Sequence, residues 1–213
     1  MRNIRAEIKK IAANYAKLLH KQMSGRDIEM EKDDTSHYLI YRVLGITEEE
    51  GRRIDVYQNK GRFLYKYAGS FLEEAATHCF VHKYPSCLIK HKIPNTLGSR
   101  PKTFEIDVLV GKTAFEIKWR DATTDGDHIT KEHTRIKAIQ KAGFQPVRVM
   151  FYYPNREQAK RIQSTLKTIY KGVHGEYYSG DDAWGFIKRY TRVDLKNILV
   201  NIAKENSKNA KQE

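Results

Sequence analysis

Two short segments of alternating apolar and polar residues, joined by a tight Gly-Lys turn, constrain the fold of this chain most strongly. They are TFEIDVLV (103–110) and TAFEIKWR (113–120), and their pattern predicts a β-hairpin. Successive side chains of a strand point to opposite faces. Pairing across the turn therefore brings Asp107 close to Glu116, with Lys118 beside them. Two carboxylates and an ammonium group are expected to converge on one surface of an otherwise apolar sheet.

The segments around this hairpin predict helices and one further strand. PVRVMFYY (146–153) is a continuous apolar run of the kind found in strands that are buried on both faces. The Gly, Tyr and Asp residues of 172–185 indicate a loop. The order helix, strand, strand, helix, strand, helix predicts an α/β (α+β) core, a mixed sheet flanked by helices. The predicted helices, in which apolar residues recur at three- and four-residue steps, are 70–84, 128–142 and 156–171.

The charge balance points to a polyanionic partner. The chain carries 39 Lys and Arg residues against 26 Asp and Glu, a formal net charge of +13 that is spread along its length. Such an excess attracts polyanions, of which nucleic acid is the most common. Its even distribution favours a groove or a wrapped surface over a disordered basic tail. The alternative is that the charge serves solubility alone.

Composition excludes several other classes of protein. Hydrophobic residues make up 40% and aromatic residues 11% of the chain, which is too rich for a disordered protein. No apolar run approaches the roughly 18 residues of a membrane span. Two cysteines without CxxC spacing predict neither a disulfide scaffold nor a zinc finger, so a reducing cytoplasm is the simplest compartment.

The beginning of the chain predicts a helical extension. Residues 3–21 have helical apolar spacing, and a Ser-Gly pair at 24–25 is expected to end that helix. We therefore divide the chain into a mainly helical extension at 1–68, available for DNA binding and dimerisation, and a core at 69–203. The core is expected to end in a single helix. The last segment, 204–213, is expected to be a frayed tail.

The residue types expected on the hairpin suit phosphodiester hydrolysis. Two carboxylates bind Mg²⁺, a hard cation that prefers oxygen ligands. The ion lowers the pKa of a bound water and neutralises charge that develops on the phosphate. The ammonium group of Lys118 would stabilise the attacking hydroxide or the phosphorane, and Arg120 would extend the positive surface. The alternative is a solvated outer face with mixed charges.

The hairpin resembles a known nuclease signature. Asp107, eight intervening residues and then Glu-Ile-Lys at 116–118 resemble the Asp…(Asp/Glu)-X-Lys motif of the PD-(D/E)XK nucleases. The resemblance covers about residues 68–171. A third strand of that family's sheet is not apparent, and Ile106 stands where the family has a proline. Within the superfamily, EIKWRDATTDGDH resembles type II restriction endonucleases, and the length of the chain is similar to that of a small enzyme of this group, such as the ThaI enzyme.

This resemblance implies roles for the residues that match the motif. Asp107 and Glu116 correspond to the metal-binding carboxylates, and the backbone carbonyl of Ile117 to a further metal ligand. Lys118 corresponds to the lysine that orients the attacking water. Members of the superfamily often add one acid from the preceding helix, and a Gly-x-x-x-Glu pattern there points to Glu73.

The same resemblance implies a fold and an activity. The fold is the PD-(D/E)XK restriction-endonuclease-like core. The activity is that of a type II restriction enzyme, in which one or two Mg²⁺ ions per site support sequence-specific hydrolysis of double-stranded DNA and leave 5'-phosphates. For the acid that the preceding helix contributes to the metal site, Glu74 is the alternative to Glu73.

The expected partners follow from that activity. Cutting both strands of a short palindromic site needs two active sites related by a two-fold axis, so we expect a homodimer. A cognate methyltransferase would belong to the same system without direct contact, in a prokaryotic cytoplasm. Two alternatives stay open. One is a structure-selective nuclease of the same fold, such as a Holliday-junction resolvase. The other is a basic nucleic-acid-binding protein without catalysis.

Further residues are candidate DNA contacts. Cations near the hairpin are expected to contact phosphates or guanine, and threonines after its second strand can reach base edges. One methionine flanked by cations is a candidate wedge between base steps, with a helix-capping role as its alternative. For the other residues the alternative is a structural or solvated role. The candidates are Met23, Arg26, Arg100, Lys102, Arg120, Thr123, Thr124, Lys131 and Arg135.

Overall fold

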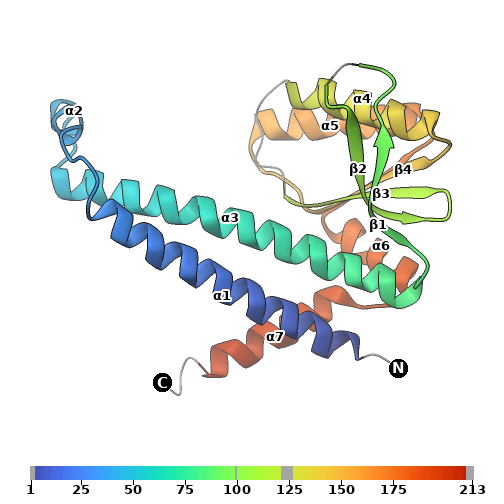
Figure 1. Ribbon diagram of the computed structural model, residues 1–213, viewed down its shortest axis with the longest axis horizontal. Helices are drawn as coiled ribbons and strands as arrows, with labels where there is room; N and C mark the ends of the chain where they lie inside the picture. Colours follow the sequence, from blue (N-terminus) through green and yellow to red (C-terminus); the bar gives the residue numbers. More distant parts are fainter. Residues whose placement is uncertain (1–2, 99, 121–126, 210–213) are drawn as a thin grey trace. The chain divides into compact units, whose positions relative to one another are not determined.

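The fold was obtained as a computed structural model that describes residues 3–98, 100–120 and 127–209 (Figure 1). The chain separates into two compact units, which are treated one at a time below. One unit is Lys9–Phe71, and the other combines Met1–Ile8 with Leu72–Glu213, as far as these residues are described. In chain order the elements are α1 (Ile4–Met30), α2 (Tyr38–Val43), α3 (Glu48–Lys83), β1 (Leu88–Pro94), β2 (Thr103–Val110), β3 (Thr113–Arg120), α4 (Asp127–Lys141), β4 (Gln145–Tyr152), α5 (Glu157–Gly172), β5 (Glu176–Ser179), α6 (Asp181–Thr191) and α7 (Leu195–Asn209).

The second unit is built on a five-stranded mixed sheet in the order β1-β2-β3-β4-β5. The strands β1, β2 and β3 are antiparallel, whereas β4 runs parallel to β3 and β5 parallel to β4. The predicted hairpin of β2 and β3 is confirmed. Two strands were missed: β1, which supplies the third strand of the meander, and β5, which lies inside the segment interpreted as a loop.

Both missed strands lack the pattern that identifies a strand in sequence. Along β1 only Ile93 is buried, because this strand lies at the edge of the sheet and most of its side chains face solvent. A strand of this kind needs no apolar alternation. The other strand, β5, has only four residues and no fully buried side chain. Its pairing with β4 depends on tertiary context.

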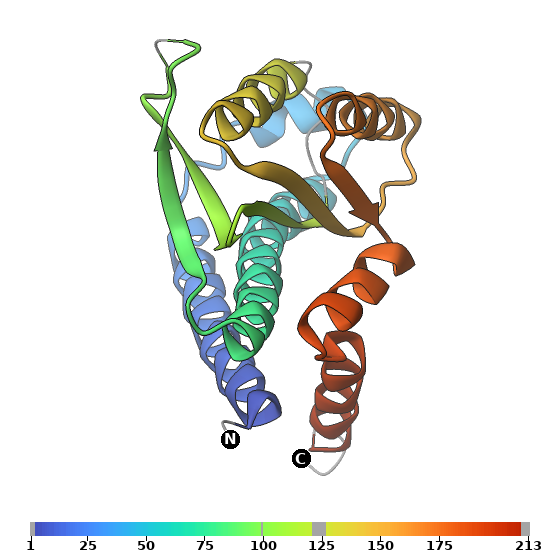
Figure 2. The ribbon, with the colours of Figure 1, turned by 90° about the vertical axis from the view of Figure 1, so that its right-hand side faces the viewer.

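Helices cover both faces of the sheet (Figure 2), which confirms the predicted layered architecture. On one face, α4 contributes Ile139 to a core cluster with Leu109 of β2 and Ala114 of β3. On the other face, Phe115 of β3 packs against Phe80 of α3, with ring centroids 4.6 Å apart, and against aromatic side chains of α6. The side chains of β3 are therefore buried on either side of the sheet.

The unit Lys9–Phe71 consists of α1, α2 and the first part of α3. The prediction that α1 ends at the Ser-Gly pair is wrong, because the helix continues to Met30. Likewise α3 is one continuous helix through Gly61 to Lys83. A glycine inside a helix costs only about 1 kcal/mol relative to alanine. Contacts between the helices, such as the ion pair of Lys60 with Asp27 at 3.0 Å, offset this cost of the glycines.

The C-terminal part of the chain differs from the predicted single helix and frayed tail. Two helices, α6 and α7, take its place, and α7 continues to Asn209. Between them Arg192 has a positive φ of 63°, a left-handed conformation that ends α6. None of the helices in the described part of the chain has an apolar window long enough to cross a membrane.

Candidate active site

Asp107 lies where β2 and β3 part. Their described backbone pairing runs from Val110–Thr113 to Val108–Phe115. The next residue, Asp107, uses its carboxylate Oδ2 to accept a hydrogen bond from the backbone N–H of Ile117 at 2.7 Å. Its side chain is buried, with 7% of the residue exposed. This side-chain bond holds the Asp107 carboxylate against β3.

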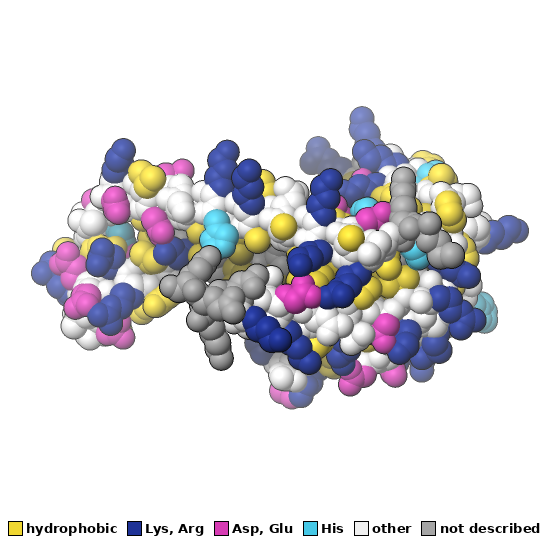
Figure 3. All heavy atoms as spheres, turned by 90° about the horizontal axis from the view of Figure 1, so that it is seen from below, with side chains coloured by type: hydrophobic (Ala, Val, Ile, Leu, Met, Phe, Trp, Pro, Cys, Tyr) yellow, Lys and Arg dark blue, Asp and Glu magenta, His cyan; other side chains and the backbone are white. Residues whose placement is uncertain are grey.

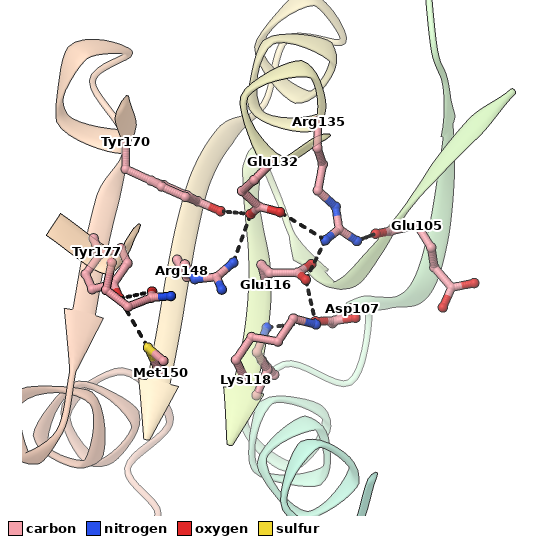
Figure 4. Close-up of polar contacts among 12 residues, drawn as sticks. Glu105, Asp107, Glu116, Lys118, Glu132, Arg135, Arg148, Met150, Tyr170 and Tyr177 are labelled. Atoms are coloured by element: carbon pink, nitrogen blue, oxygen red, sulfur yellow. Dashed lines mark hydrogen bonds and ion pairs between the residues drawn. The ribbon is translucent and has the colours of Figure 1, made fainter. Parts of the chain in front are cut away.

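Glu116 is the neighbouring acid on β3, and only 3% of it is exposed. Its Oε1 accepts from Lys118 Nζ at 2.6 Å and from Arg135 Nη1 at 2.5 Å. The other terminal nitrogen of Arg135 donates to the carbonyl of Glu105 at 2.7 Å. Figure 4 shows these side chains pointing toward one another from β2, β3 and α4. The predicted convergence of Asp107, Glu116 and Lys118 is confirmed, and the alternative of a solvated outer face is wrong.

Burial makes the negative charge at this site costly. Burial is the main reason why the pKa of Asp107 is raised to about 6; Lys118 acts against it, and the carboxylate of Glu73 adds to it. Burial also raises the pKa of Glu116 above its usual range, although Lys118 lowers it. Burial by itself would lower the pKa of Lys118, but Glu116 and Asp107 outweigh that effect and raise it. The ammonium group is therefore charged, and burial stays the largest effect on the pKa values of both acids.

Glu73 of α3 belongs to this electrostatic group. Its carboxylate acts on the pKa values of both Asp107 and Lys118, whereas the adjacent Glu74 is exposed and acts on neither. The electrostatics therefore distinguish the two acids that the sequence left open, and they favour Glu73.

The acids have the chemistry that a divalent cation requires. Mg²⁺ prefers carboxylate oxygens and keeps several waters, and a bound cation would favour the charged forms of Asp107 and Glu116, whose pKa values are raised by burial. Within the described ranges, no group of three or more His, Cys, Asp or Glu side chains is arranged to hold a metal ion. The two carboxylates fit a hydrated cation, held by few protein ligands, better than an all-protein cage.

A buried ion-pair network braces the site, and sequence reasoning missed it. Glu132 of α4 pairs with Arg148 of β4 at 3.0 Å and accepts a hydrogen bond from Tyr170 of α5 at 2.8 Å. Glu132 Oε2 also lies 3.6 Å from Arg135 Nη1, which in turn holds Glu116. One signal was present in the sequence: Arg148 is a lone charge within an otherwise apolar strand. Such a residue needs a buried partner.

The candidate DNA contacts near the hairpin occupy different surroundings. Arg100, Lys102, Arg120 and Lys131 are exposed, on the loop before β2, at the end of β3 and on α4. Arg135 was interpreted as a phosphate contact on the surface of α4, but the structure places it against Glu116 instead. Thr123 and Thr124 lie outside the described residues.

Met23 and Arg26 lie in the helical unit. The premise that Met23 follows the end of a helix is wrong, because both residues are inside α1 and Met23 is half-buried there. Its capping role is excluded for the same reason, and its contact with DNA stays a prediction. Arg26 pairs with Glu29 at 3.0 Å and stacks over Phe63. Figure 3 shows Lys and Arg side chains spread over the face of the molecule that it draws.

Comparison with known proteins identifies the family. A family model described as ApaLI-like restriction endonuclease matches residues 1–204, nearly the whole chain. Searches of curated proteins and of solved structures give no match. The finer resemblance to the ThaI enzyme is not confirmed. The buried acid pair and lysine on a hairpin, within a helix-flanked mixed sheet, agree with the match, and the chain belongs to the ApaLI-like restriction endonuclease family, nucleases that act on double-stranded DNA.

Proposed function

We propose that this protein is a type II restriction endonuclease that hydrolyses both strands of a short palindromic DNA site in a Mg²⁺-dependent reaction and leaves 5'-phosphates. The observation that carries the proposal is the cluster of Asp107, Glu116 and Lys118: Asp107 accepts the Ile117 N–H across the β2–β3 hairpin at 2.7 Å, and Lys118 lies 2.6 Å from Glu116 on β3. Burial of two acids beside an ammonium group is costly for folding. A catalytic role accounts for that arrangement, whereas DNA binding alone does not need it.

Asp107 and Glu116 would hold the ion, with Glu73 and the Ile117 carbonyl as further candidate ligands. When bound, Mg²⁺ supplies an activated water and neutralises charge on the phosphate. Lys118 is held beside the acids by Glu116 Oε1. From there its ammonium group stabilises negative charge on the attacking oxygen or on the phosphate.

Arg135 orients Glu116 in this arrangement. Because its two terminal nitrogens are bound to Glu116 and to the Glu105 carbonyl, the guanidinium ties the acid of β3 to the backbone of β2. Its position is in turn supported by Glu132. Fixed ligands bind a metal ion with less loss of side-chain entropy, so this bracing serves the metal site.

Two copies of the chain are proposed to act together on the palindrome. The helical extension at 1–68 was predicted to be available for dimerisation, whereas Ile202 of α7 is only 5% exposed. An exposed apolar surface lies on α3. Ile54, Tyr57 and Leu64 share one helical face and are 51%, 73% and 52% exposed.

Two observations support the proposal that a second copy packs on this face of α3. Within Lys9–Phe71, which is described throughout, Tyr38 is the only buried apolar side chain, so the unit lacks a core of its own. Gly61 lies on the same face, and a Cβ there would meet nothing within 4 Å. Antiparallel pairing of two α3 helices sets Tyr57 opposite Gly61 and Ile54 opposite Leu64. Tyr57 and Gly61 then match a large side chain to a small one, and the whole arrangement is self-complementary about a two-fold axis.

Incubation of the protein with plasmid DNA and Mg²⁺ tests the proposal, with a four-way junction as the second substrate. Discrete plasmid fragments are expected. Cleavage confined to the junction would instead mean a structure-selective nuclease, and a gel shift without cleavage would mean a binding protein. As a restriction enzyme, the protein would act in a prokaryotic cytoplasm beside a cognate methyltransferase that protects the host DNA.

A further inference from the structure

The helical unit contains a polar pocket that has no part in the cluster around Glu116. It has a volume of about 290 Å³ and lies between α1 and α3. Arg26 of α1 and three polar residues of α3, Asn59, Arg62 and Lys66, line it together with the ring of Phe63. The α3 residues follow the three- and four-residue spacing of one helical face. The pocket is therefore a feature of the paired helices and not of a loop.

Positive charge around this pocket is only partly compensated. Of its three cations, Arg26 pairs with Glu29 at 3.0 Å. The Nε of Arg26 is buried and has no hydrogen-bond partner within the described residues. The neighbouring cation Lys60 is neutralised by Asp27 and lies outside the lining. One acid beside three cations leaves a net positive pocket, which an anion would stabilise.

The shape and donors of the pocket fit a phosphodiester group. Guanidinium groups present planar forks of N–H donors that match phosphate oxygens, and a lysine adds a compact charge. The guanidinium of Arg26 stacks over the Phe63 ring, 5.6 Å from its centroid, which limits the orientations that its fork can take. The apolar ring supplies a wall against which a sugar can pack.

We propose that Arg26, Arg62 and Lys66 form a phosphate-binding pocket that binds the backbone of duplex DNA. The proposal rests on the proposed function for the presence of DNA. It adds an anchoring site on the helical unit, with a phosphodiester of either strand as ligand. Phosphate contacts carry no base information, so the pocket strengthens binding to target and random sequences equally.

Salt dependence of DNA binding tests the pocket directly. Each phosphate contact contributes about 0.9 to the slope of log K against log salt concentration. In a Lys118→Ala background, which prevents cleavage, Arg62→Gln and Lys66→Gln combined are expected to lower that slope by about one, the contribution of one phosphate. Together they should weaken binding by roughly tenfold, on target and random duplexes alike. Fluorescence anisotropy with labelled duplexes measures both quantities.

Arg53→Gln is the matched control, because Arg53 lies on the same helix, pairs with Glu49 and does not line the pocket. It should leave the slope unchanged, and circular dichroism should show equal helix content in all variants. The proposal is overturned if the pocket variants keep the original slope, or if Arg53→Gln lowers it equally. Cleavage by the unsubstituted chain tests the proposed function independently of these slopes.

Discussion

The carboxylate Oδ2 of Asp107 accepts the backbone N–H of Ile117 at 2.7 Å, just beyond the last described backbone pair of β2 and β3. The side chain of Asp107 thus continues the contact between the two strands. It binds Ile117, the residue next to Glu116, and so holds the two acids of the site close together. An asparagine at position 107 retains an acceptor oxygen for this bond while it removes the charge. Asp107→Asn therefore separates the electrostatic role of this residue from its structural role.

Asp107→Asn should stabilise the metal-free protein at alkaline pH. Folding raises the pKa of Asp107 to about 6, so ionisation of the buried acid opposes folding above that pH. The variant should gain about 1–3 kcal/mol in the free energy of unfolding near pH 8.

The gain should shrink as the pH falls through 6 and vanish near the ordinary pKa of aspartate, at about 4, where the acid is protonated in both states. Urea unfolding in the presence of EDTA measures it. An equal gain at every pH would show that burial of the charge is not its source.

Glu73 and Glu74 form a matched pair for testing the third acid. Glu73→Gln should reduce cleavage by about ten- to a hundredfold and weaken metal binding, because its carboxylate acts on Asp107 and Lys118. Glu74→Gln should leave both unchanged. Isothermal titration with Mn²⁺ reports the binding and a plasmid assay the rate. If Glu74→Gln had the larger effect on both readouts, the assignment of Glu73 would be wrong.

Removal of Arg148 should show how much the unpaired charge of Glu132 lowers the free energy of unfolding. Arg148→Met leaves Glu132 buried without its principal partner, so the free energy of unfolding should fall by about 3–5 kcal/mol. Replacing both residues, as Glu132→Leu with Arg148→Met, should recover much of that loss. Chemical denaturation of the two variants decides the point. Equal stability of the single and double variants would mean that the charge of Glu132 is compensated elsewhere.

The dimer contact on α3 can be broken by charge. Glutamates at Ile54 and Leu64 would bring four like charges together in the proposed pairing, so Ile54→Glu/Leu64→Glu should yield a monomer. Because both side chains are more than half exposed, the variant should still fold. Light scattering of the DNA complex gives the number of chains per duplex. A complex that still contains two chains would place the contact on another surface.

The hairpin was predictable because its alternation, its turn and its charged positions agree with the tertiary structure. The convergence of Asp107, Glu116 and Lys118 was predicted from that pattern, and their roles from the resemblance to the PD-(D/E)XK motif. Arg135 and Glu132 were not, because a helix carries charged side chains on its solvent face for solubility, and periodicity cannot tell which of them turn inward. In this chain α4 buries Glu132 beside Ile136, and only the partner Arg148, on a different element, explains why.

Helix boundaries in the extension were less predictable. Local breakers such as Gly25 and Gly61 suggested ends where the helices continue. The continuation depends on contacts between α1 and α3, such as the edge-to-face packing of Tyr15 on Tyr67 and Phe71. These contacts join residues about fifty positions apart, which no local pattern reveals.

The most direct test of the central claim is to compare the unsubstituted protein with Lys118→Ala on the same plasmid DNA with Mg²⁺. The unsubstituted protein should produce discrete fragments that carry 5'-phosphates and can be rejoined by DNA ligase. Lys118→Ala should bind the same DNA but cleave it about a thousandfold more slowly, because the ammonium group that Glu116 holds at 2.6 Å is absent. Cleavage by Lys118→Ala at the original rate would contradict the assignment of this hairpin as the active site.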